Sequence, residues 1–334
     1  MSLWINVKMD KLKTIEIAPY NTNWPLQYEY EAQKIKKALK KTLVNIHHVG
    51  STSVPELDAK PIIDIIAEVR TLNFEHNALL NLGYDYRGSF NIPLKKTFTA
   101  RKPDVRINLH IVEQDNPEIE LNLLFRDYLR KNKTAKDEYE SLKYQLIKKE
   151  TSHQKNNTFF RGYTLGKYEL IQKILKKTGF KKLRFVFCSH YAEWEAAKSY
   201  RHKYFFQPNN IDDPYTWTFN HKDHKHFILY KGSTILGYAH IQLWPNYSAA
   251  LRIIVIDKTM RRQGLGTEFM FLIEKWLKRQ GYKSIHSESP PSALNFYKSL
   301  GYTPMPFNDP DHYEGSPQDI TMGKIFKTSP LKTE

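Results

Sequence analysis

The sequence contains one cysteine among 334 residues, and this scarcity excludes several kinds of protein. With Cys188 alone, an internal disulfide framework and a cysteine-based metal cluster are both excluded, so we expect a reducing compartment, the cytoplasm. Long apolar runs are missing as well: none approaches the ~18 residues that a membrane span needs. Residues 1–13 also lack the apolar core of a signal peptide. We therefore expect a cytoplasmic protein without a membrane partner.

Internal repeats and low-complexity tracts are absent too, which leaves ordinary globular domains. A chain of 334 residues that is 40% hydrophobic is long enough for two domains with separate cores. A helical pattern over residues 168–175 ends near Gly179, and a strand-like run over 183–188 follows. We expect a disordered extension over 1–13, a first domain over 14–178, a linker over 179–182 and a second domain over 183–328.

The net charge of +16 is spread over both halves of the chain. Such an excess is typical of a solvated lysine-rich surface, or of a protein that attracts polyanionic small molecules such as CoA or nucleotides. Binding to nucleic acid would need a concentrated basic patch or a recognisable module. The sequence has neither, so we do not expect a nucleic-acid partner.

A glycine-containing turn, Arg-Arg-Gln-Gly-Leu-Gly at residues 261–266, lies between a strand-like run (251–256) and a helix-like run (267–280). Glycines let the backbone approach a ligand closely. The amides at the start of the following helix point outward with the positive end of the helix dipole. The pattern predicts a pyrophosphate site. A further strand-like run (283–288) then precedes the string Phe-Tyr-Lys-Ser-Leu-Gly-Tyr at 296–302.

This order of elements resembles the acetyl-CoA half of the GNAT N-acetyltransferase family. The family signature is R/Q-x-x-G-x-G/A after the fourth strand and a tyrosine in the helix after the fifth, and Arg261, Gly264, Gly266 and Tyr297 fit it. The asparagine often found at the start of that helix is replaced by Pro290. The resemblance covers roughly residues 183–327. It implies a GNAT fold, with a mixed central sheet flanked by helices, and acetyl-CoA as the donor.

The resemblance also implies how acetyl-CoA is held. The amides of the strand can pair with the amide groups of pantetheine as an added strand. Backbone donors of the turn bind the pyrophosphate, while the two arginines add positive charge; two solvated arginines are the alternative. The predicted set is Ile253, Val255, Arg261, Arg262, Gln263, Gly264, Leu265, Gly266 and Thr267.

Acetyl transfer to an amine needs a neutral amine, a polarised carbonyl and a proton for the departing thiolate. Tyrosine suits the last task because its pKa, about 10, is close to that of an alkyl thiol. We predict Tyr297 as this acid, in a helix with Ser289 as N-cap and Pro290 as first residue; a packing tyrosine is the alternative. Glu288 is the first candidate for the general base. The other candidates are His286, Asp257 and His240.

The acceptor is expected to be a small-molecule amine or a peptide amino terminus, bound by the irregular segments 200–219 and 304–318. The second segment contains Asp309, Asp311 and Glu314. These acids suit a cationic amine, although a solvated turn explains them equally well. The histidines at 221, 224 and 226 alternate with lysines and have no cysteine near them, so no metal site is expected.

Three strings mark the first half: Gly-Ser-Thr-Ser-Val-Pro at 50–55, Lys-Pro-Ile-Ile-Asp-Ile at 60–65 and Phe-Arg-Asp-Tyr-Leu-Arg at 125–130. They resemble the GrpB family over roughly residues 15–175. The resemblance implies an α/β fold of the nucleotidyltransferase type, with a mixed sheet and helices. Helical patterns are predicted at 25–43, 137–149 and 166–177.

Nucleotidyltransferases bind a triphosphate at a Gly-Ser turn and hold two Mg²⁺ ions with three carboxylates. Asp64 matches one carboxylate, but apolar Ile66 occupies the second place. The strand expected to supply the third offers Asn108 and His110, and Asp104 fits only with a shifted register. Active nucleotidyl transfer, phosphate binding and a purely structural turn all stay open. The candidate phosphate-binding residues are Gly50, Ser51, Ser53, Lys60, Asp64 and Arg126.

The sequence as a whole predicts an acetyl-CoA-dependent N-acetyltransferase that acts on an amine by direct attack. Its GrpB-like domain is expected to bind a phosphorylated ligand, a nucleotide included, or to be structural. Two alternatives are a non-catalytic regulatory protein that binds CoA and nucleotides, and a metal-dependent nucleotidyltransferase in the first half. The sequence does not predict the acceptor, the interdomain geometry or the oligomeric state.

Overall fold

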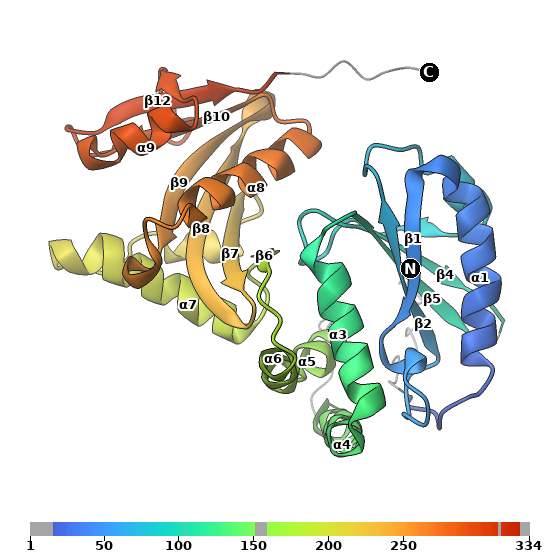
Figure 1. The fold of residues 1–334 in the computed structure, drawn as a ribbon. Helices are drawn as coiled ribbons and strands as arrows, with labels where there is room; N and C mark the ends of the chain where they lie inside the picture. Colours follow the sequence, from blue (N-terminus) through green and yellow to red (C-terminus); the bar gives the residue numbers. More distant parts are fainter. Residues whose placement is uncertain (1–15, 104, 151–158, 313–314, 328–334) are drawn as a thin grey trace, which may run out of the picture. The chain divides into compact units, whose positions relative to one another are not determined.

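A computed structural model describes residues 16–103, 105–150, 159–312 and 315–327. The predicted disordered extension over 1–13 lies outside these ranges, as do Asp104 and Glu314. The chain forms two compact units, one from residues 1–87 and 96–178 and the other from 88–95 and 179–334 (Figure 1). Within the described ranges, no helix combines the length and apolar character needed to cross a bilayer.

The first unit is built on a mixed five-stranded sheet of order β1-β2-β5-β4-β3. Strands β2 and β5 are parallel, and the other neighbours are antiparallel. Helix α1 (Trp24–Leu39) packs on one face of the sheet and helix α3 (Pro117–Lys131) on the other. The strands are β1 (Leu43–Val49), β2 (Ile62–Val69), β3 (Asp85–Tyr86), β4 (Lys96–Arg101) and β5 (Arg106–Glu113).

The helices of the first unit differ at their ends from the sequence prediction. Helix α1 stops at Leu39, where Lys40 turns the backbone to positive φ, and a 3₁₀ turn leads into β1. The predicted helix 25–43 was therefore too long. Two apolar residues of this helix face solvent, since Leu26 and Tyr30 are 68% and 64% exposed. The helices are α1 (Trp24–Leu39), α2 (Asn77–Asn81), α3 (Pro117–Lys131), α4 (Lys133–Glu150), α5 (Phe159–Leu165) and α6 (Tyr168–Lys177).

The second unit is built on a mixed seven-stranded sheet of order β11-β12-β10-β9-β8-β7-β6. Only the β9–β10 pair is parallel among these neighbours. The strands are β6 (Leu183–Phe187), β7 (His224–Lys231), β8 (Thr234–Trp244), β9 (Ser248–Ile256), β10 (Ser284–Ser289), β11 (Thr303–Pro304) and β12 (Ile320–Ile325). Both units thus have the mixed α/β architecture that the sequence predicts.

Helices cover both faces of this second sheet. Helices α8 (Leu265–Arg279) and α9 (Leu294–Ser299) share one apolar core with the sheet, while α7 (Tyr191–Arg201) lies on the opposite face. Strand β7 shows the alternation of a two-sided sheet. Phe227 belongs to the core under α8, whereas the Tyr230 hydroxyl donates to Glu193 on α7 at 3.1 Å.

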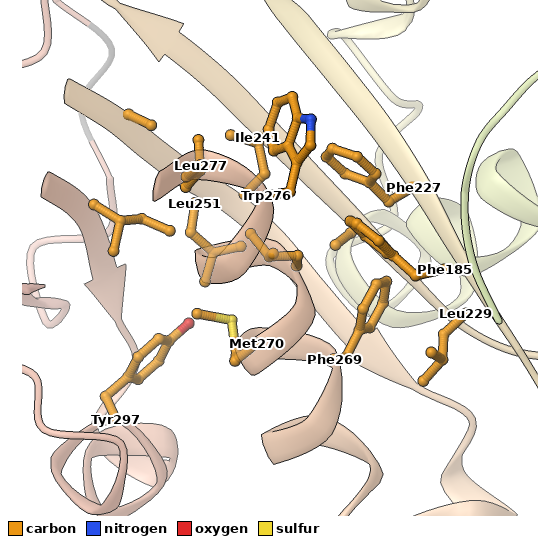
Figure 2. Packing of buried hydrophobic residues seen from close by; sticks show 14 of the residues in the cluster. Phe185, Phe227, Leu229, Ile241, Leu251, Phe269, Met270, Trp276, Leu277 and Tyr297 are labelled. Carbon is orange, nitrogen blue, oxygen red and sulfur yellow. The ribbon is translucent and has the colours of Figure 1, made fainter. Parts of the chain in front are cut away.

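Aromatic side chains fix α8 on the sheet (Figure 2). Trp276 meets Phe227 edge to face at a centroid distance of 5.0 Å, and Phe269 meets Phe185 at 6.0 Å. One side of this helix belongs to the core, since Leu265, Phe269, Ile273 and Trp276 are buried. Burying side chains of this size contributes about 1.5–3 kcal/mol each. This packing fixes the direction in which the amino end of α8 points.

Candidate functional site

Strands β9 and β10 run together for only part of their length. They pair at Ser248–Ser284, Ala249–Ile285 and Ala250–His286, and no later pairing joins them in the described ranges. Strand β9 nevertheless continues to Ile256. Its later part, which contains the predicted residues Ile253 and Val255, therefore has a main-chain edge that faces away from β8 and lies open on the β10 side. An extended ligand can add to such an edge as a strand.

A β-bulge in β9 changes the direction of one side chain at this place. Leu251 pairs with Ile241 and Ile253 pairs with His240, so Arg252 has no opposite residue. The Arg252 guanidinium donates to the Gln242 side-chain oxygen at 2.8 Å and forms an ion pair with Asp309. The bulge thus ties β9 to the loop that precedes β12.

These contacts bear on the predicted acidic acceptor loop. Asp309 is bound by Arg252, and Asp311 accepts a hydrogen bond from Gln242. Both carboxylates are engaged by the chain itself, which favours a structural role for them over recognition of a cationic amine. Glu314, the third acid of the prediction, lies outside the described residues.

The two glycines of the turn serve different purposes. Gly264 is the N-cap of α8 with φ +76°, and a Cβ there would meet no atom within 4 Å, so backbone conformation alone calls for glycine. Gly266 lies inside the helix, where a Cβ would come within 3.3 Å of Phe296 on α9. The first-turn amides of α8, which include Gly266 and Thr267, have no carbonyl partner within the helix. They are available for an anion.

Arg261 and Arg262 lie at the exposed start of the turn. The Arg261 Nε donates to the Ile256 carbonyl at 2.9 Å, and its guanidinium lies 5.0 Å from the centre of the Tyr204 ring. Arg261 thus stabilises the end of β9. Its contact with phosphate stays a prediction. Tyr204 was expected in the acceptor segment but contacts Arg261 instead. Its hydroxyl accepts a hydrogen bond from the Lys258 amide at 3.0 Å.

Tyr297 lies on α9 and is 5% exposed. Its hydroxyl points toward Met270 (Figure 2). The helix begins later than predicted: a 3₁₀ turn, Pro291–Ala293, precedes α9, and Ser289 still belongs to β10. Ser289 as an N-cap was wrong, since its hydroxyl donates to the Pro290 carbonyl.

Ser287 connects Tyr297 to the point where β9 and β10 separate. Its hydroxyl lies 3.3 Å from the Tyr297 hydroxyl and 3.3 Å from the Leu251 carbonyl. Burial raises the pKa of Tyr297, and the Ser287 hydrogen bond acts in the opposite direction by stabilising the phenolate. Ser287 was not among the residues predicted from the sequence. The available signal was a serine two residues after Ile285, on the buried face of its strand.

Glu288 follows Ser287 on β10, and its side chain therefore points to the other face of the sheet. Its carboxylate packs against Gly315, where a Cβ would lie 2.4 Å from Oε1. Burial raises the pKa of Glu288 above that of an ordinary glutamate. A carboxylate with a raised pKa is a stronger base, which suits proton removal from an amine.

The geometry argues against two of the other candidate bases. The hydrogen bonds from Thr259 hold the pKa of Asp257 below its usual range, which makes it a weaker base. Both ring nitrogens of His286 are engaged, one with the Pro306 carbonyl at 3.2 Å and the other with the Ser284 hydroxyl at 3.0 Å.

His240 belongs to a buried network that fixes its protonation state. Arg201 forms a two-pronged ion pair with Asp213, with distances of 2.5 and 2.8 Å, and its Nη1 donates to His240 Nδ1 at 3.3 Å. Because an arginine only donates, that nitrogen carries no proton, and His240 Nε2–H donates to His224 Nδ1 at 2.8 Å. Burial, with the nearby His226 and Arg201, holds the pKa of His240 well below its usual value. A buried, neutral ring directed in this way does not serve as a base.

A second arm of the same network fixes His226. Arg201 donates to the Tyr238 oxygen at 3.3 Å, Tyr238 donates to His226 Nδ1 at 2.7 Å, and His226 Nε2 donates to the Thr218 carbonyl at 3.1 Å. Both ring nitrogens of His226 are therefore engaged by the fold, while His224 accepts from His240 through Nδ1. No group of three or more possible metal ligands comes together in the described part of the chain.

In the first unit, the Gly50 turn is closed around Asp64. Gly50 has φ +71°, and a Cβ there would lie 2.4 Å from Asp64 Oδ2, so both conformation and space require glycine. Ser53 Oγ donates to the Gly50 carbonyl at 2.6 Å, and Arg130 donates to the Ser53 carbonyl at 2.6 and 2.9 Å. The predicted ligand Ser53 thus stabilises the turn itself.

Arg126 has a similar role to Arg130. Its Nη1 donates to the His48 carbonyl at 2.9 Å, and its Nε to Asp127 at 2.7 Å. Of the six predicted phosphate-binding residues, Ser53 and Arg126 are thereby committed to the turn and its supporting strand. The Ser51 side chain is hydrogen-bonded to Tyr139.

The surroundings of Asp64 do not fit a two-metal centre. Asn108 lies beside it on β5 and donates its amide to Asp64 Oδ1 at 2.8 Å, so a donor faces the carboxylate. His110 Nε2 lies 3.9 Å from the same oxygen. Ile66, at the second carboxylate position, is 2% exposed and part of the core. One carboxylate that already accepts a hydrogen bond cannot replace three free ones.

Comparison with known proteins gives two family matches. The family model described as GrpB protein matches residues 14–177, and the one described as Acetyltransferase (GNAT) family matches residues 189–302. UPF0157 protein BH1888 of Halalkalibacterium halodurans is 34% identical over 170 residues, which cover 49% of this chain and 82% of that protein.

Two further relatives match the same half. UPF0157 protein YqkA of Bacillus subtilis is 38% identical over 138 residues, and the match covers 40% of each chain, so the similarity spans less than half of YqkA. The crystal structure of the conserved protein GrpB from Enterococcus faecalis is 33% identical, with 49% of this chain and 96% of that chain covered at a TM-score of 0.43.

Proposed function

Because this chain belongs to the GrpB family and continues into a GNAT-family acetyltransferase domain, we propose that its second unit is an acetyl-CoA-dependent N-acetyltransferase. One observation carries the proposal. The Tyr297 hydroxyl is hydrogen-bonded to Ser287 at the point where β9 and β10 separate. Tyr297 lies on α9, which packs against the start of α8. A proton donor, an open strand edge and a helix amino end thus meet at one place. The proposed domain limits stay at 14–178 and 183–328.

Each predicted residue or segment has one role in the proposed reaction. The β9 edge at Ile253 and Val255 pairs with pantetheine, and residues from Arg261 to Thr267 hold the pyrophosphate. Glu288 takes a proton from the amine, whose nitrogen forms a bond to the acetyl carbon. Tyr297 gives its proton to the sulfur as the carbon–sulfur bond breaks. Free CoA and an N-acetyl product result.

Direct attack is favoured over a covalent acetyl-enzyme. Cys188 follows β6, and burial together with the nearby Glu193 raises the pKa of its thiol well above the usual value. A thiol that stays protonated is a poor nucleophile.

A thiol-release screen tests the proposed activity. We expect free CoA to appear when acetyl-CoA is mixed with the full chain and one of a panel of polyamines, amino sugars, amino acids and peptides with free amino termini. Tight acetyl-CoA binding without thiol release across the whole panel would contradict catalysis. It would support the alternative, a regulatory protein that binds CoA and nucleotides.

The pH dependence of this activity tests Glu288. A base must be ionised, so kcat/KM should rise with pH through the pKa of Glu288, which burial places above that of an ordinary glutamate. Glu288→Gln should lower kcat/KM by about 100-fold and remove this acidic limb. The exposed Glu268→Gln, on α8, is the matched control. An unchanged limb in Glu288→Gln would assign the base elsewhere.

For the first unit we propose binding of a phosphorylated ligand, such as a nucleotide, without nucleotidyl transfer. Of the six predicted residues, Gly50, Ser51, Lys60 and Asp64 stay candidates, whereas Ser53 and Arg126 are hydrogen-bonded within the fold. The poor fit of Asp64 and its neighbours to Mg²⁺ supports binding over catalysis. Release of pyrophosphate from a nucleoside triphosphate with Mg²⁺, abolished in Asp64→Ala, would restore the transferase alternative.

A further inference from the structure

A buried chain of hydrogen bonds in the second unit ends at His224 with a donor that the fold does not use. Arg201 donates to His240, and His240 Nε2–H donates to His224 Nδ1, so this nitrogen of His224 is an acceptor. Burial lowers the pKa of His224 to about 4, so near neutral pH the ring is uncharged and its single proton is on Nε2. His224 is 6% exposed, and its Nε2 has no hydrogen-bond partner among the described residues. The chain of hydrogen bonds therefore holds one N–H group in a fixed direction without an acceptor.

Trp244 offers a second donor of the same kind. It is 7% exposed, and no residue in the described ranges accepts from its Nε1–H. His224 pairs with Gln242, and Trp244 lies two residues further along β8, so the three side chains are on one face of the sheet. A buried donor without an acceptor is unfavourable in a folded protein. Two of them at one end of one face indicate a place where a ligand supplies the acceptors.

The side chains that cover His224 lie at the surface. The Trp217 and His221 rings each meet the His224 ring edge to face, at a centroid distance of 5.1 Å. Trp217 is 44% exposed, and His221 is exposed as well. His224 thus lies directly under surface side chains, whose displacement would open Nε2 to a ligand.

The charges nearby favour a neutral acceptor atom. Asp309 forms an ion pair with Arg252, whereas Asp311 accepts from the neutral amide of Gln242, the residue that pairs with His224. A carboxylate or phosphate on the ligand would be repelled by the Asp311 carboxylate. A protonated polyamine has only donors, so it cannot accept from Nε2. A carbonyl oxygen accepts a hydrogen bond without adding charge.

The proposed base Glu288 lies on the same face, and its distance from His224 sets the length of the ligand. His286 is in register with Ala250 on β9, and Ala250 with Gln242 on β8, so the β10 side chains at 286 and 288 share the face of His224. Two strands lie between β10 and β7, which makes three strand spacings, about 14 Å. Because one residue of extended peptide covers about 3.5 Å, about four residues span this distance.

We propose that the second unit acetylates the amino terminus of an extended peptide, and that His224 Nε2 donates to a carbonyl oxygen of the peptide backbone. The inference rests on the proposed acetyltransferase function, for which it names the class of acceptor. A peptide presents a neutral oxygen at every residue, and in extended form it reaches from Glu288 to His224. The Trp244 Nε1–H, on the same face, binds a second carbonyl of the same chain.

Thiol release from acetyl-CoA, measured with the full chain and three kinds of amine, tests this proposal. The amines are a mixture of tetrapeptide amides of random sequence, spermine and glucosamine. We expect kcat/KM to be highest for the peptides. His224→Asn keeps an oxygen that can accept from His240 but removes the Nε2 donor, so it should lower kcat/KM for the peptides by about tenfold or more. Any turnover of spermine, which has no acceptor for this donor, should not change.

Lys231→Asn is the matched control, because Lys231 is exposed at the opposite end of β7. It should turn over peptides as the unchanged chain does, and thermal unfolding shows whether both variants fold. Faster turnover of spermine or glucosamine than of peptides would overturn this inference and leave acetyl transfer intact. A peptide rate that is unchanged in His224→Asn, or that falls equally with the spermine rate, would exclude the carbonyl contact. Absence of thiol release with every amine would overturn the proposed function as well.

Discussion

Replacing Tyr297 with phenylalanine is expected to lower the turnover number by about 100-fold or more, because general acids contribute about 10²–10⁴-fold. The affinity for acetyl-CoA should change little. The ring of Tyr297 stays within the core around Met270, and only the hydroxyl beside Ser287 is lost (Figure 2). Steady-state thiol release gives the turnover number, and calorimetry with acetyl-CoA gives the affinity.

Tyr302→Phe is the control for this experiment. Tyr302 is 2% exposed and meets Tyr297 edge to face at 5.4 Å, so the substitution removes the same atom from the same core. It should leave turnover within a few-fold of the unchanged chain. Equal losses in both variants would indicate a packing role for Tyr297, and unchanged turnover in Tyr297→Phe would exclude it as the acid.

Replacing Arg201 with methionine is expected to destabilise the second unit by about 3–5 kcal/mol, the usual cost of removing one partner of a buried ion pair. Arg201 is 1% exposed, and Asp213, which is 12% exposed at its side chain, would keep its charge without its partner. His240 and Tyr238 would lose a donor as well. Urea unfolding, followed through the transition of the second unit, measures the loss.

Lys198→Met on the same helix is the control. Its ion pair with Glu195 is 54% and 66% exposed, and such surface pairs contribute about 0–1 kcal/mol. If Arg201→Met lowers the free energy of unfolding no more than Lys198→Met does, then Asp213, Tyr238 and His240 find other partners in the variant. NMR of the histidine ring nitrogens offers a second readout, since the tautomer of His240 should change once Arg201 no longer donates to Nδ1.

Local patterns account for what the sequence predicted well. The signals that predict the glycine turn, the strand before it and the helix after it all come from residues close together in the sequence. The helical pattern over 267–280 was confirmed for the same reason, since α8 spans Leu265–Arg279. Both family resemblances also depend on short contiguous strings.

The wrong or missing predictions concern residues whose partners are far apart in the sequence, or residues whose role depends on which one hydrogen bond the side chain makes. The acids of the 304–318 segment suggested a cationic ligand, because nothing local indicates that a bulge aims Arg252 at Asp309, 57 residues away. Serine is a residue type favoured at helix N-caps, but the pairing of Ser289 with Ile320 keeps this residue in β10. Arg201 gave no signal at all, because its partners Asp213, Tyr238 and His240 are brought to it only by the folded sheet.

The contact between Gly266 and Phe296 has a consequence for how this protein can change. The helix start proposed to hold the donor lies against the helix that carries Tyr297, and a Cβ at position 266 would come within 3.3 Å of the Phe296 ring. A side chain larger than a methyl group there would press on the Phe296 ring, which precedes Tyr297 on α9. Donor affinity and proton delivery are therefore linked through one interhelical contact.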